Sequence, residues 1–299
     1  METERDWWRN KIAEDIYTTF RTKEQLIPVL CGNSPQLWAR RPLVDWISLL
    51  VEKLAISSSA QHLAVYLLDY FMDSLEVSRA HLYLLAMACL LIAVKFEDHT
   101  EKVPSLAVLN AYLPKTAYTM DIIGYHMMEY NAMELTVLKY FDWKVSVVTV
   151  AQFLPYFLMV SVDSSDLHNG NPVNNSKDIV KCYVEKHSNY FQEISLQDHL
   201  FRDFQPSLVA ACCVASARIC LRLTPTWPKQ LELMTDFYLE ELLPCVQMML
   251  RMQQLDEQKN APMCHMPVSI CRQPMPVQSS IQYATYVVGD RSGFRLHCI

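Results

Sequence analysis

Apolar residues recur at helical spacing along nearly the whole chain. Between residues 38 and 55, for example, Leu43, Trp46, Ile47, Leu50 and Leu54 alternate with charged side chains in the pattern of one buried helix face. The same periodicity predicts helices over residues 9–20, 38–55, 62–73, 79–96, 118–141, 178–191, 206–223 and 228–251, a short helix opened by Pro104, and a second unit beginning at 148–160. The expected fold class is therefore all-α.

One of these helices is expected to be central. The stretch from Leu82 to Val94 is apolar on nearly every side and too short to span a bilayer, so it is predicted to lie inside a helical bundle. It places small residues at Ala86, Cys89 and Ala93, and the later helix repeats this spacing at Ala210, Cys213 and Ala217. Either the chain holds two unrelated alanine-rich core helices or it holds two copies of one bundle.

The remaining stretches are polar or irregular. Residues Asp163 to Lys177 are rich in Ser, Asn and Asp and are predicted to form a surface loop. After Gln254 the periodicity is lost, and the proline-containing tail is predicted to be disordered.

Composition narrows the function classes. Only 5 of 299 residues are glycine, and neither a dinucleotide nor a phosphate-loop motif is present, so no nucleotide cofactor is expected. A net charge of −6 without a basic stripe argues against direct binding of nucleic acid. No catalytic motif or metal-ligand spacing stands out, and neither a membrane-spanning helix nor a secretory signal is expected. No enzyme active site, cofactor, metal or membrane partner is therefore expected.

Two charged residues stand beside apolar surface. Lys95 ends the apolar run of its helix, where the helix dipole favours a cation. Glu134 lies among Met133, Leu135 and Val137, where a carboxylate needs a partner or solvent. They form either a local ion pair or a charged rim beside an apolar face that binds another protein.

Four segments resemble the cyclin family. Residues 39–46 (ARRPLVDW) are similar to the motif that opens the cyclin box, and residues 63–71 (LAVYLLDYF) to its next helix. Residues 91–98 (LIAVKFED) and 133–138 (MELTVL) resemble the third and fourth motifs, in the family's order and spacing. Trp7-Trp8 and the Pro-Thr-Trp-Pro run at 225–228 are most similar to the J-type cyclins.

The resemblance implies two tandem five-helix cyclin-box folds. It places an N-terminal arm with a short helix at residues 1–35, the N-terminal box at 36–146, the C-terminal cyclin fold at 147–253 and the tail at 254–299. It also implies a regulatory subunit that binds and allosterically activates a cyclin-dependent protein kinase in cell-cycle control. Lys95, Phe96, Glu134 and Trp143 match the family's kinase-binding positions.

The resemblance implies a second, modified surface. Leu43, Trp46 and Leu82 match a hydrophobic patch on which family members dock kinase substrates, a second class of expected partner. Leu49 and Tyr83 replace polar residues at its rim, which weakens the case for recruiting Arg-x-Leu peptides. Arg40 and Asp45 are predicted to form a structural pair within the box.

One alternative function stays open. A cyclin-fold scaffold or adaptor would bind other proteins without activating a kinase, and the altered patch and the unusual tail fit that reading. Retention of both Lys95 and Glu134 favours the kinase regulator. No basic import cluster is present, and localisation in the nucleus, the cytoplasm or both is expected.

Overall fold

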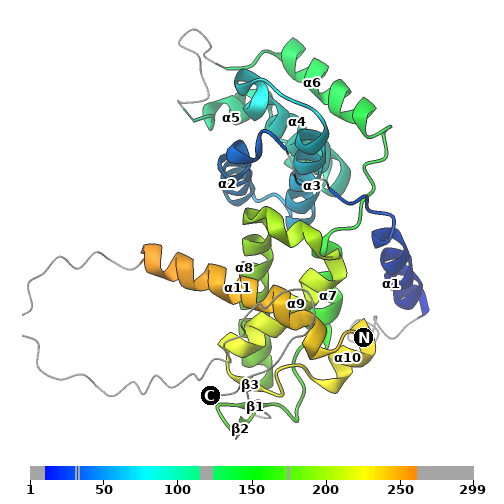
Figure 1. The fold of residues 1–299 in the computed structure, drawn as a ribbon, viewed down its shortest axis with the longest axis vertical. Coiled ribbons are helices and arrows are strands. Elements are labelled where there is room, and N and C mark those ends of the chain that lie inside the picture. The colour runs from blue at the N-terminus through cyan, green and yellow to red at the C-terminus, as the bar shows by residue number, and fades with distance from the viewer. Residues whose placement is uncertain (1–10, 31, 33, 115–123, 174–175, 261–299) are drawn as a thin grey trace, which may run out of the picture. The chain divides into compact units, whose positions relative to one another are not determined.

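The described residues of this computed structural model, 11–30, 32, 34–114, 124–173 and 176–260, form two helical bundles in sequence (Figure 1). The first bundle contains α2 (Leu37–Leu54), α3 (Ser58–Ser74), α4 (Leu82–Glu97), α5 (Leu106–Ala111) and α6 (Met127–Tyr140). The second contains α7 (Val150–Met159), α8 (Lys177–Gln197), α9 (Pro206–Cys220), α10 (Lys229–Thr235) and α11 (Leu239–Asn260). Short 3-10 turns at Arg79–His81, Thr100–Lys102 and His199–Asp203 join some of them.

Each bundle is built around one buried helix, and that of the first bundle is the helix predicted to be central. In α4 every residue from Leu82 to Val94 except Tyr83 is buried, and the helix packs against α2, α3 and α6. In α9 nearly every residue from Ser207 to Arg218 is buried, and the helix packs against α7 and α8. The two buried clusters are separate cores, so the prediction of two copies of one bundle is confirmed.

Length and apolar composition alone would let one described helical stretch, Arg79–Glu97, cross a bilayer. Most of that stretch is buried inside the first bundle, as expected for the core helix of a globular domain.

The N-terminal helix α1 (Lys11–Glu24) belongs to the second bundle, although it precedes the first in sequence (Figure 1). Ala13 is part of the second core, and Tyr17 and Phe20 place their rings about 6 Å from that of Phe153. The predicted short helix at residues 9–20 is therefore a longer element with a fixed place. Trp7-Trp8 lie outside the described residues.

Several predicted boundaries are wrong for local reasons. The helix expected over 118–141 begins only at Met127, where the Glu129 carboxylate accepts the His126 amide, and residues 115–123 are not described. The helix expected over 228–251 is broken at Asp236, which adopts a left-handed backbone with φ of 59°. The second half, α11, continues to Asn260, so the first residues of the predicted disordered tail are helical; residues 261–299 lie outside the described part.

The predicted loop from Asp163 to Lys177 contains a small hairpin. Strands β1 (Leu167–His168) and β2 (Asn171–Pro172) flank Asn169 and Gly170, which both have positive φ. Asn-Gly suits a tight hairpin turn because both residues tolerate that conformation. β1 also pairs with β3 (Leu223–Thr224), giving the order β2-β1-β3, and strands of two residues are too short for a periodic signal.

Candidate functional site

Lys95 and Glu134 form an ion pair between two helices of the first bundle. Lys95 lies in the last turn of α4, and Glu134 faces it from α6 with 2.5 Å between Nζ and Oε1. The Lys95 side chain is 46% exposed and that of Glu134 is 17% exposed. The pair therefore sits at the rim of the core, where both groups keep some capacity to bond to an approaching partner.

Tyr130 contributes a third, buried side chain to this site. Sequence reasoning missed it. The Lys95 ammonium donates to the Tyr130 hydroxyl at 3.3 Å and lies 5.6 Å from the centre of its ring. Burial raises the pKa of Tyr130 above its usual value, and the neighbouring Glu134 carboxylate raises it further. The i, i+4 spacing of Tyr130 and Glu134 was the available signal, since it places both on one face of the helix.

Three exposed apolar side chains belong to the same two helices as this pair or to the turn that follows them. Phe96 follows Lys95 directly and is 49% exposed, while Met127 precedes Tyr130 by one helical turn and is also exposed. Trp143 is 62% exposed in the turn after α6, with a left-handed backbone and its amide bonded to the Leu138 carbonyl. Exposed aromatic and methionine side chains beside charges are typical of surfaces that bind proteins.

The predicted substrate-docking patch does not reach the surface. Leu43, Trp46 and Leu82 are each 5% exposed or less, as members of the first core. The Trp46 indole donates to the Tyr112 carbonyl at 2.9 Å, and the Tyr83 ring packs edge-on against it. The aromatic residue at position 83 thus adds a ring contact to Trp46, while Leu43 and Leu82 are built into the core.

The predicted pair of Arg40 and Asp45 is also wrong. Residues five apart lie on different faces of a helix, whereas residues four apart are neighbours. Accordingly Arg41 binds Asp45 at 2.9 Å, and Arg40 binds Asp69 of α3 through two hydrogen bonds of 2.7 and 2.9 Å. The structural role expected of Arg40 remains, with a partner on a different helix.

Arg40 also joins the two bundles. Its Nη1 donates to the Gln197 carbonyl at the end of α8, and the Arg202 guanidinium lies 3.5 Å from the same Asp69 carboxylate.

Within the described residues, no group of three or more His, Cys, Asp or Glu side chains is arranged to hold a metal ion.

Comparison with known proteins defines the class. The model of the cyclin N-terminal domain matches residues 15–146, and that of the cyclin C-terminal domain matches residues 148–269. Two cyclin domains in tandem thus account for most of the chain. The protein belongs to the cyclin family, whose members are regulatory subunits and not enzymes.

Individual relatives refine this assignment. The chain is 41% identical to Cyclin-J of Xenopus laevis and 40% identical to Cyclin-J of Homo sapiens, each over 84% of its own length. It spans 64% and 63% of the length of those two relatives. A viral cyclin structure from herpesvirus saimiri matches its fold with a TM-score of 0.56 at 16% identity, covering 79% of this chain and 96% of that one.

Proposed function

We propose that this protein binds a cyclin-dependent protein kinase and activates it allosterically, in the control of cell division. The observation that carries the proposal is the ion pair of Lys95 and Glu134 at the edge of the first core, with half-exposed Phe96 beside it. We define the kinase-binding face as Lys95, Phe96, Tyr130 and Glu134, with Met127 and Trp143 as outlying apolar residues.

The charges alone supply too little energy for activation. Shifting a kinase from an active-to-inactive ratio of 1:99 to a ratio of 99:1 takes about 5.5 kcal/mol of differential binding. An exposed ion pair contributes about 0–1 kcal/mol. At ~25 cal/mol per Å² the remainder corresponds to burial of roughly 200 Å² of apolar surface, which Phe96 and its apolar neighbours can provide. The charges then set orientation and partner choice.

Rigidity of the face makes the selection possible. Lys95 and Phe96 stand at the end of α4, whose preceding residues are locked in the core, and Glu134 is held by Lys95. A rigid surface binds only the kinase conformation that fits it, and so shifts the population toward that conformation. In the active state the kinase aligns its own Lys–Glu pair with the phosphates of ATP. All of the chemistry then belongs to the kinase.

The test uses charge reversal on both sides of the pair. The full chain, as wild type, K95E or E134K, is incubated with a panel of purified cyclin-dependent kinases, and both capture and peptide phosphorylation are measured. Each single variant is expected to weaken capture about tenfold or more, because a like charge now faces the kinase. Circular dichroism melting curves check that each variant is folded.

The double variant K95E/E134K separates kinase contact from internal stability, because the swap restores the ion pair with reversed polarity. If the pair served only the fold, the swap would recover activation, and that result would contradict the proposal. Lys229 and Glu232 of α10 form a matched exposed pair with 2.6 Å between Nζ and Oε2. The corresponding swap there is expected to leave kinase binding unchanged.

A stable complex without a gain in kinase activity would favour the alternative function, a non-activating scaffold. The proposal includes no substrate docking through Leu43, Trp46 and Leu82, because all three are buried.

A further inference from the structure

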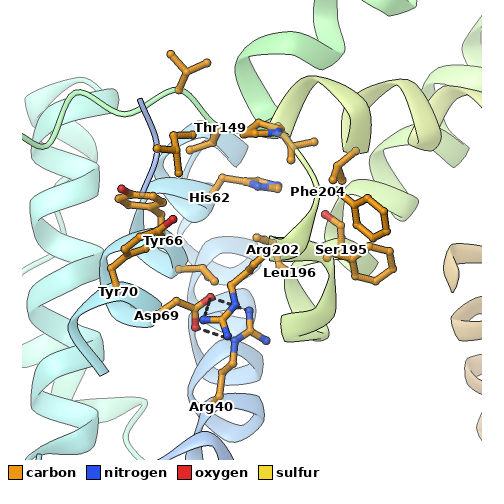
Figure 2. A pocket seen from close by; sticks show the side chains of 17 residues that line it. Arg40, His62, Tyr66, Asp69, Tyr70, Thr149, Ser195, Leu196, Arg202 and Phe204 are labelled. Atoms are coloured by element: carbon orange, nitrogen blue, oxygen red, sulfur yellow. Dashed lines mark hydrogen bonds and ion pairs between the residues drawn. The ribbon is translucent and has the colours of Figure 1, made fainter. Parts of the chain in front are cut away.

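A cavity of about 120 Å³ lies where the two bundles meet, between α3 of the first and α7, α8 and α9 of the second (Figure 2). Its wall is mostly apolar and includes Val65, Leu196, Phe204 and Val209. An apolar cavity of roughly 150 Å³ stays dry and admits benzene. The space between the bundles is therefore of the size that holds a single aromatic ring.

His62 of α3 gives this wall a polar group without a partner. Figure 2 shows its imidazole pointing into the space between the two sets of helices. The side chain is 4% exposed, and Nε2 is buried with no hydrogen-bond partner. Among the buried side-chain nitrogen and oxygen atoms without partners in the described part of the chain, it is the one on this cavity.

Three other polar groups of the wall are already engaged. The Ser195 hydroxyl donates to the Gln192 carbonyl at 2.6 Å, and the Thr149 hydroxyl donates to Gln152 at 2.6 Å. At the far end the Asp69 carboxylate is bound by Arg40. Among the buried side-chain atoms of the described lining, His62 Nε2 is thus the one without a hydrogen-bond partner.

The imidazole is neutral at ordinary pH, because burial lowers the pKa of His62 to about 3. A neutral imidazole nitrogen either accepts from a hydroxyl or donates to it, depending on the tautomer. A hydroxyl satisfies both cases, since it is donor and acceptor. A carboxylate can only accept, so it satisfies Nε2 in one tautomer alone, and the uncharged ring offers no ion pair to offset the cost of burying the anion.

We propose that this cavity binds a small uncharged aromatic alcohol, with its ring against Val65, Leu196 and Val209 and its hydroxyl bonded to His62 Nε2. The site is separate from the kinase-binding face, and the proposal does not depend on kinase activation. A ligand seated here touches both bundles, so its binding stabilises their contact by linkage.

The test compares three probes that share one fluorinated ring. Binding of 4-fluorophenol, fluorobenzene and 4-fluorobenzoate to the full chain is titrated by ¹⁹F NMR. We expect saturable one-to-one binding of 4-fluorophenol, about tenfold tighter than fluorobenzene, since one net hydrogen bond separates them. Absence of saturable binding, or equal affinity for the two neutral probes, overturns the proposal. Tightest binding of 4-fluorobenzoate also overturns it and points to Arg202 at the charged end.

Variants assign the site. H62F keeps a ring but removes Nε2, and it is expected to abolish the preference for 4-fluorophenol over fluorobenzene. V209M fills part of the cavity and is expected to weaken both neutral probes. H187Q changes a half-buried histidine of α8 outside the cavity lining and serves as the matched control without effect. If H62F does not fold, the relative affinity of the wild type for 4-fluorophenol and fluorobenzene, together with the effect of V209M, still tests the proposal. If H62F folds and its relative affinity for the two probes is unchanged, the proposal is contradicted.

Discussion

Glu24 of α1 caps a helix that begins at residue 206. Its Oε2 accepts the Ser207 amide at 3.0 Å and its Oε1 accepts the Ser207 hydroxyl at 2.9 Å, while Arg21 bonds to both Glu24 and Ser207. The first amides of a helix have no partner within it, and the helix dipole favours an anion there. The N-terminal arm is thus fastened to the second bundle by a cap supplied from 183 residues away.

Removing this cap is expected to release α1. In E24A the buried Ser207 amide loses its acceptor, at a cost of about 1–3 kcal/mol in the free energy of unfolding. Hydrogen exchange over residues 11–24 should speed up while α4 stays protected. E14A, at an exposed position of the same helix, is the control. Unchanged exchange of α1 in E24A would show that Tyr17 and Phe20 hold the helix without the cap.

The buried patch leads to a second prediction. Because Leu43, Trp46 and Leu82 are enclosed in the core, a labelled Arg-x-Leu peptide is expected not to bind the full chain in a fluorescence polarisation assay. W46A should instead lower the stability by about 3–5 kcal/mol, as expected for loss of a large buried aromatic side chain. Saturable peptide binding to the wild type that W46A abolishes would restore the docking patch.

Some of this architecture was predictable from the sequence because it rests on local periodicity. The continuous apolar run from Leu82 to Val94 marked α4 as central, and the lysine after it marked the rim of the core. The ion pair of Lys95 and Glu134 is one of the two arrangements that their apolar surroundings in the sequence left open. These features depend on residue types at fixed spacings, which one sequence displays directly.

The rest depends on contacts between distant segments. Helical spacing excludes Asp45 as the partner of Arg40, but only the packing of α2 on α3 brings Asp69 to it. Residue types marked Trp46 as apolar, but its contacts with Tyr83 and the Tyr112 carbonyl, which accompany its burial, come from other segments. The contact of Glu24 with Ser207 likewise leaves no periodic trace.

A buried ion pair in the second bundle supports a third prediction. Arg218 and Asp166 are almost completely buried and share two hydrogen bonds of 2.9 Å, and Arg218 also donates to the carbonyls of Ser161 and Pro225. Removing one member leaves an uncompensated buried charge, so R218A is expected to cost about 3–5 kcal/mol in denaturant unfolding.

Two comparisons define the cause of that loss. Replacing both partners with apolar residues, as in R218M/D166L, should recover part of the stability because no charge is left unpaired. D45A, which breaks the exposed pair with Arg41, should cost less than about 1 kcal/mol. A double variant as unstable as R218A would assign the loss to the backbone carbonyls and not to the charge.

His62 makes the stability of the first bundle sensitive to acid. Its pKa is lowered from 6.5 to about 3 by burial, so between these values the unfolded chain binds a proton that the folded chain does not. The free energy of unfolding therefore falls as the pH falls through this window.

Between pH 7 and pH 5 the loss due to His62 is expected to be about 2 kcal/mol, from 1.4 kcal/mol per pH unit below 6.5. Urea unfolding of the wild type and H62F at several pH values measures it, since carboxylates and exposed histidines contribute equally to both proteins and cancel in the difference. H62F should have the flatter profile whatever its stability at pH 7. Parallel profiles would mean that His62 gains a partner or solvent when it is protonated, and that the cavity beside it opens to water in acid.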